Sequence, residues 1–270
     1  MGRPGLIILM LVIATPVLAE TPVTGRDQPM RFSRAAVQAI AAKSYHTDLA
    51  RLARKDKLDT DKKTLHRVRR ICSRLIAQAI VLKPEASHWP WEIHLTSDPE
   101  VAAYSMSGGK LLISTHFIQH YKLTDDELAV ALAHEIGHVI AEHVREQMSV
   151  AASFEAPVPN RVIKAGDVVN SMESDIGVFF SLQPLSRLQE LEADDIGIEL
   201  TARTGISPSA ATSFYTKIGH DSGGQSILDT HGPTRQRTEF IKSMVDFAQP
   251  VYEASRGAPL PAYAFINHDQ

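Results

Sequence analysis

The sequence contains a single cysteine, Cys72, among its 270 residues. One cysteine cannot form an intramolecular disulfide, and it excludes a cysteine-rich zinc module, which needs at least two thiolates. An excess of basic residues is also missing, because 28 Lys and Arg against 31 Asp and Glu give a formal net charge of −3. Nucleic-acid-binding proteins typically carry a strong basic excess, so the composition gives no support for a nucleic-acid partner.

Long apolar runs are absent after the first nineteen residues, and no later stretch has the roughly 20 apolar residues that cross a bilayer. A G-x-S-x-G nucleophile motif and internal repeats are absent as well. Hydrophobic residues make up 44% of the chain and charged residues 22%, a balance typical of globular proteins. We therefore expect one folded domain with its own core.

Residues 1–19 have the pattern of a secretory signal peptide. Arg3 supplies positive charge, residues 6–14 are apolar, and Val17 and Ala19 occupy the two positions that signal peptidase reads. We expect cleavage after Ala19, export to the periplasm and a mature chain without a transmembrane segment. An uncleaved membrane anchor is the alternative interpretation.

The remaining boundaries follow from composition. Residues 20–248 are predicted to form a single domain, in which residues 20–30 are a flexible lead-in with two prolines and a glycine. Residues 249–270 are predicted to be an irregular tail, because Pro250, Pro259 and Pro261 interrupt any regular element.

The hydrophobic pattern predicts a mostly helical α+β fold. Helical periodicity covers most of residues 32–82, and the segments 91–96, 101–106 and 110–114 have the pattern of short strands. A capping box at Thr124–Glu127 begins a long apolar helix that we expect to continue to about Gln147. Further helices are predicted near residues 115–121, 162–184, 186–203, 209–219 and 234–248. The small sheet is expected beside the long apolar helix.

That helix carries the motif H-E-x-x-H at residues 134–138. Two histidines four residues apart project from one helix face, so His134 and His138 can reach a single metal ion. Glu135 leans toward the same site, close enough to hold a metal-bound water. The surrounding residues are almost all apolar, so burying these three polar side chains costs free energy unless each of them has a partner. A pair of hydrogen-bonded core histidines is the alternative.

A catalytic zinc site needs a third protein ligand. The best candidate is Glu190, with Asp194 one helical turn later on the same face. Glu190 can complete a His2Glu site, and Asp194 can then accept a hydrogen bond from the second imidazole nitrogen of His134. Glu192 and Asp195 are the competing candidates for the third ligand.

The segment HEIGH together with SRLQELEAD, residues 186–194, resembles the HtpX/CAAX-protease-like zinc peptidases, metallopeptidase family forty-eight, and in particular its soluble exported, BepA-like branch. Residues 230–233 with Arg237 are similar to the family's T-H-P-x4-R segment. Residues 101–109 resemble its edge strand N-A-F-x-x-P-G-G. The resemblance covers roughly residues 70–245.

The resemblance implies a zincin-like domain with one zinc ion per chain, held by His134, His138 and Glu190, and Glu135 as general base. It places His231 near the metal, either as an oxyanion donor or as a ligand that keeps the enzyme latent. Arg237 would support His231 or the substrate. An extended substrate would pair with the strand that contains Ala103, Tyr104 and Ser105.

The function implied is a zinc-dependent endopeptidase that hydrolyses protein or peptide substrates, with misfolded envelope proteins as candidates, in envelope quality control. The alternative is a chaperone-like or latent protein that keeps the fold and the metal site but cleaves little. The segment 149–184 has two interpretations, a lid over the cleft or a helix packed on the core.

Overall fold

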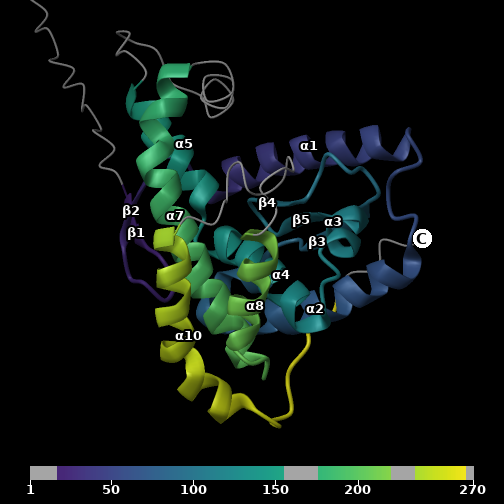
Figure 1. The fold of residues 1–270 in the computed structure, drawn as a ribbon. Coiled ribbons are helices and arrows are strands. Elements are labelled where there is room, and N and C mark those ends of the chain that lie inside the picture. Colours follow the sequence, from purple (N-terminus) through teal and green to yellow (C-terminus); the bar gives the residue numbers. More distant parts are fainter. Residues whose placement is uncertain (1–16, 155–175, 220–234, 266–270) are drawn as a thin grey trace, which may run out of the picture.

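The computed structural model describes residues 17–154, 176–219 and 235–265 (Figure 1). The helices in this part are α1 (Arg34–Ala53), α2 (Lys62–Leu82), the short 3-10 helix η1 (Pro84–His88), α3 (Thr115–His120), α4 (Asp125–Ile140), α5 (His143–Phe154), α7 (Ile176–Arg203), α8 (Ser209–Gly219) and α10 (Arg235–Ser255). The strands are β1 (Val17–Glu20), β2 (Asp27–Met30), β3 (Glu92–Thr96), β4 (Ala103–Met106) and β5 (Lys110–Ser114).

The predicted α+β class is confirmed. The main sheet has the order β3-β5-β4, with β5 parallel to β3 and antiparallel to β4. Helix α1 covers one face of this sheet, and α2 and α4 pack against the other (Figure 1). Strand β4 is an edge strand, as the sequence predicted for this segment, and it lies beside α4.

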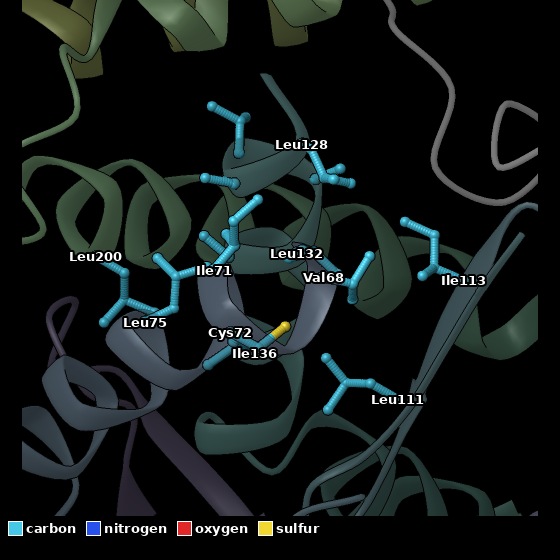
Figure 2. Close-up of a cluster of buried hydrophobic side chains, with 14 of the residues drawn as sticks. Val68, Ile71, Cys72, Leu75, Leu111, Ile113, Leu128, Leu132, Ile136 and Leu200 are labelled. Atoms are coloured by element: carbon cyan, nitrogen blue, oxygen red, sulfur yellow. The ribbon is translucent and has the colours of Figure 1, made fainter. Parts of the chain in front are cut away.

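Helix α4 lies at the centre of the core, because it is buried on almost every side. Its apolar residues pack against α2, α7 and α8. Figure 2 shows side chains of α4 among those of α2, β5 and α7, with Val68, Ile71, Cys72, Leu75, Leu111, Ile113, Leu128, Leu132, Ile136 and Leu200 labelled. Cys72 is fully buried here, and burial raises the pKa of its thiol, so it serves as a small core hydrophobe.

The capping box at the start of α4 is present, because the Thr124 side chain accepts from Glu127 and the Glu127 side chain accepts from Thr124. The predicted continuation to Gln147 is wrong. The helix ends at Ile140, and Glu142 has a left-handed backbone with φ 56°. This conformation costs a non-glycine residue roughly 1–2 kcal/mol. Ion pairs from Arg34, Lys83 and Arg145 to the Glu142 carboxylate offset that cost.

Two prolines were predicted to end helices and do not. Helix α7 continues through Pro184, where we expected a boundary, and α10 continues through Pro250 to Ser255. Val251 and Tyr252 pack against the main core, which offsets the hydrogen bond lost at Pro250. The irregular tail therefore begins after Ser255, and the backbone N–H of Tyr263 donates to the Ser73 carbonyl at 2.9 Å.

Residues 20–30 are better ordered than the expected lead-in, because β1 and β2 form an antiparallel hairpin. Most of the segment 149–184 lies outside the described residues, including residues 162–175 of the helix predicted near 162–184. The choice between a lid and a packed helix therefore stays open. In the part of the chain that the structure describes, even the 28-residue α7 lacks the apolar composition needed to cross a bilayer, and so do the other helices.

Helices α4 and α7 approach each other backbone to backbone. A Cβ added to Gly137 would lie 2.9 Å from the Ala193 carbonyl oxygen, and one added to Gly197 would lie 2.9 Å from the His134 backbone nitrogen. Ala193 is fully buried at this contact. The small residues therefore bring the histidine face of α4 directly against the acidic face of α7.

Substituting Gly197→Ala should lower the free energy of unfolding by about 1–3 kcal/mol, because the new methyl group overlaps the α4 backbone. Thermal and urea unfolding measure the effect. Gly219→Ala, at an exposed glycine in α8, is the matched control and should leave stability nearly unchanged. Equal stability of the two variants would contradict the close contact between α4 and α7.

Candidate metal centre

Three polar side chains from two helices converge at the contact between α4 and α7. The Nε2 atoms of His134 and His138 lie 3.1 Å apart, and each lies 3.4 Å from an oxygen of Glu190. All three residues are largely buried, and their candidate donor atoms lie within 4.8 Å of one another. The structure thus brings together the three residues that the sequence predicted as ligands.

The donor set fits a zinc ion. Two imidazole nitrogens and one carboxylate are a common set of protein ligands for catalytic zinc. Bonds of about 2.0–2.1 Å in tetrahedral geometry place ligand atoms about 3.3–3.4 Å apart, close to the 3.1–3.4 Å found here. Burial lowers the pKa of His134, but Asp194 and Glu190 outweigh burial and raise it to about 9. The pocket therefore favours a positive charge at this position.

Asp194 fixes the orientation of the first histidine. Its Oδ1 lies 2.9 Å from His134 Nδ1, which leaves Nε2 facing the other two donors. Asp194 is fully buried and also accepts from the guanidinium of Arg237 and the hydroxyl of Tyr215. Burial raises the pKa of this carboxyl, but Arg237 and His134 outweigh burial, so its pKa is lowered and it remains charged.

Arg237, which was predicted to support His231 or the substrate, contacts two acidic residues of the centre. Its guanidinium lies 2.6 Å from Asp194 Oδ2 and 3.2 Å from Glu190 Oε2, so it supports two acidic groups of the centre. The predicted partner His231 lies outside the described residues. Tyr215 on α8 was missed by sequence reasoning, because nothing in its local spacing links it to Asp194.

In a helix that continued to Gln147, as predicted, His143 would point away from the ligand face, because it follows His138 by five residues. The helix break at Glu142 instead places His143 Nδ1 2.8 Å from His138 Nδ1. Its other nitrogen lies 3.4 Å from Glu192 Oε2. His143 therefore contacts the second histidine much as Asp194 contacts the first.

Glu192, a competing candidate for the third ligand, faces away from the centre. It accepts hydrogen bonds from Thr24 at 2.9 Å and from Arg26 at 2.6 and 2.8 Å, and both donors lie between β1 and β2. Burial raises its pKa, but His143 and Arg26 outweigh burial and lower it to about 2. The N-terminal hairpin is thereby connected to His138 through Glu192 and His143.

Glu135 lies in the helix that carries the two histidines, and β4 lies beside that helix. Glu135 is buried in α4 next to His134. In β4, Ala103 and Ser105 pair with Ile113 and Leu111, whose side chains lie in the core with α4. Tyr104 points to the opposite face of the sheet, and its hydroxyl donates to Asp48 at 3.1 Å. The side chain of Tyr104 therefore faces α1 rather than α4.

A helix with H-E-x-x-H that packs against a second helix with an acidic donor defines the class of His2Glu metalloproteins. The sequence model of peptidase family M48 matches residues 62–245. Because this match covers more than half of the chain, the chain belongs to peptidase family M48, which confirms the resemblance found in the sequence.

Curated relatives include two kinds of protein. The mitochondrial metalloendopeptidase OMA1 of Arabidopsis thaliana is 32% identical over 56% of this chain and 31% of its own length. The Escherichia coli metalloproteases LoiP and YcaL are 30% and 28% identical, over 56% and 57% of this chain. The matches cover 61% of each of these two relatives, so the chain spans less than two thirds of all three.

Substituting Asp194→Asn should weaken metal binding by about 10- to 100-fold, because His134 loses its orienting carboxylate and Arg237 its charged partner. Zinc titration with a competing chelator measures the change. Asp195→Asn, at the next position of α7, is the matched control. If both variants bound zinc equally well, Asp194 would not orient the ligand.

Asp195 should make stability depend on pH. Burial and the nearby carboxylates of Glu199, Asp194 and Glu192 raise its pKa to about 6 from an ordinary 3.8. Above pH 6 the folded state therefore holds an unfavourable charge, which protonation relieves as the pH falls from 6 toward 3.8. Asp195→Asn should raise the melting temperature at pH 8, and this gain should shrink below pH 6.

Melting curves of wild type and Asp195→Asn between pH 4 and 8, with metal chelated throughout, test this dependence. Asp126→Asn removes an exposed carboxylate from the first turn of α4 and controls for a general effect of lost charge. A difference between Asp195→Asn and wild type that is constant across this pH range would contradict the raised pKa.

Proposed function

We propose that this protein is a zinc-dependent endopeptidase. The observation that carries the proposal is the convergence of His134, His138 and Glu190 at 3.1–3.4 Å, directly beside the buried Glu135. The names of its relatives OMA1, LoiP and YcaL, all metalloproteases or metalloendopeptidases, support the same activity.

Zinc, when bound, supplies a Lewis acid that polarises the substrate carbonyl and acidifies water. Glu135 accepts a proton from the attacking water on its carboxylate and then delivers it to the nitrogen of the departing amine. Asp194 and His143 keep the two ligand histidines in orientation. We further propose that His231 donates a hydrogen bond to the developing oxyanion.

The substrate would bind as an added strand on β4. Ala103, Tyr104 and Ser105 are the residues whose backbone would pair with it, because within residues 17–154, 176–219 and 235–265 β4 has no neighbour on its outer side in the main sheet. Backbone pairing reads little of the side-chain sequence. Many protein and peptide substrates are therefore compatible with this mode of binding.

Export to the periplasm, and a role there in quality control of misfolded envelope proteins, complete the proposal. The signal-peptide pattern of residues 1–19 supports export. Cleavage after Ala19 would remove most of β1 but keep Thr24, Arg26 and Gln28, which hold Glu192 and Glu146. The contacts from the hairpin to α5 and α7 would therefore survive maturation.

Glu135→Gln should retain zinc but lose at least about 100-fold in peptide hydrolysis, because the amide cannot accept the proton from water. Metal analysis together with casein cleavage measures both properties. Asp126→Asn removes an exposed carboxylate from the same helix and should cleave normally. Substantial turnover by Glu135→Gln would refute its role as the base.

The alternative function is a chaperone-like or latent protein with the same fold. Casein incubated with the zinc-loaded wild type, with and without a chelator, separates the two functions. We expect cleavage that the chelator abolishes. Binding of unfolded casein without cleavage would favour the alternative.

A further inference from the structure

A small pocket lies beside the end of β4. It is lined by residues of α1, α4, α5 and the β4–β5 turn, by the residue after η1 and by the one between α4 and α5, among them Arg34, Trp89, Ser107, Gly108, Glu142 and Arg145. Its volume is about 10 Å³, room for roughly one water-sized group such as a single carboxylate oxygen, and it is partly open to solvent. We propose that this pocket is a substrate subsite that binds a carboxylate of the peptide being cleaved; the inference rests on the proposed peptidase function.

The charge around the pocket favours an anion. Among the described residues that line the pocket, Glu142 is the only one with a carboxylate, and three cations surround it: Arg34 at 2.7 Å, Arg145 at 3.0 Å and Lys83 at 3.3 Å. Glu85 lies farther from Arg34, at 3.8 Å, and is mostly exposed. The cluster therefore carries more positive than negative charge, although Glu142 itself is charged. Burial raises the pKa of Glu142, but these cations outweigh burial and lower it.

Donors for a ligand are available on both arginines. Arg34 gives its Nε and Nη2 to Glu142, and Arg145 gives its Nε to the Phe32 carbonyl and its Nη1 to Glu142. Among the described residues, Nη1 of Arg34 and Nη2 of Arg145 have no hydrogen-bond acceptor. An arginine N–H group binds a carboxylate oxygen with a charge-assisted hydrogen bond. Trp89, over which Arg34 lies at 5.8 Å, forms an apolar wall.

The pocket lies close to the proposed base on α4 and to the proposed substrate strand β4. Glu135 and Val139 lie four residues apart in α4, which places this pocket residue on the side of the helix that carries the proposed base. Ser107 and Gly108 directly follow β4, the proposed substrate strand. Four residues of helix, from Glu135 to Val139, span about 6 Å, and three residues of a strand span about 10 Å. The bound carboxylate should therefore lie two to four residues from the scissile bond.

Two sources of carboxylate fit this chemistry, an acidic side chain or the free C-terminus of a peptide. Fluorogenic peptides that differ only in Glu or Gln at each position, from four residues before to four after the cleaved bond, test the first source. Peptides that end two to four residues after the bond in a free carboxylate or an amide test the second. We expect about a 10-fold higher kcat/KM for the charged member at one position.

Arg34→Gln should reduce this ratio to about one, and Arg34→Lys should keep part of it because the charge is retained. Arg54→Gln removes an exposed arginine at the other end of α1 and should leave the ratio unchanged. Circular dichroism and melting curves show whether each variant is folded. A ratio near one in the wild type, or a preference that survives in folded Arg34→Gln, would overturn the proposal.

Failure of the peptidase function is distinguishable from failure of the pocket. If no peptide is cleaved, fluorescence anisotropy with labelled Glu and Gln peptides still measures the binding preference, in wild type and in Arg34→Gln. Tighter binding of the charged peptide that Arg34→Gln removes would support the pocket without hydrolysis. Equal binding of all the peptide pairs would reject the subsite.

Discussion

The candidate metal centre depends on the contact between α4 and α7. Gly137 and Gly197 leave no room for a side chain where the two helices meet, so their backbones define the distance between the histidines and Glu190. The donor atoms lie 3.1–3.4 Å apart because both helices are held by the surrounding core, with α4 buried on nearly every side. A metal ion would bind to a site that the protein has already arranged, so little ordering entropy opposes binding.

Each of the two ligand histidines is supported by its own row of charged and polar side chains. Behind His134 lie Asp194 and then Arg237, and behind His138 lie His143 and then Glu192. Each buried charge in these two rows contacts a group of opposite charge or a histidine, which avoids the free-energy cost of an isolated ion in the core. The row behind His138 ends in Arg26, which pairs with both Glu192 and Glu146. The N-terminal hairpin is therefore part of the support for the centre.

Local sequence patterns predicted where helices form better than they predicted where those helices end. The capping box before α4 was correctly located because both partners lie within one helical turn. The end of α4 was missed, because the left-handed Glu142 is stabilised by Arg34 and Lys83, which lie far away in the sequence. Pro184 and Pro250 were expected to end helices, but both lie inside α-helices in the structure. At Pro250, the packing of Val251 and Tyr252 on the core outweighs the local preference.

The sequence alone determined the chemistry of the centre, because His134, Glu135 and His138 share one helical turn and Glu190 and Asp194 share another. Periodicity is a local property, so it could assign each residue to a face without knowing the fold. Only the tertiary structure decided which faces meet, and it added His143, Tyr215 and the cations around Glu142. Those contacts join segments that are distant in the chain, and their geometry follows from packing that no local pattern specifies.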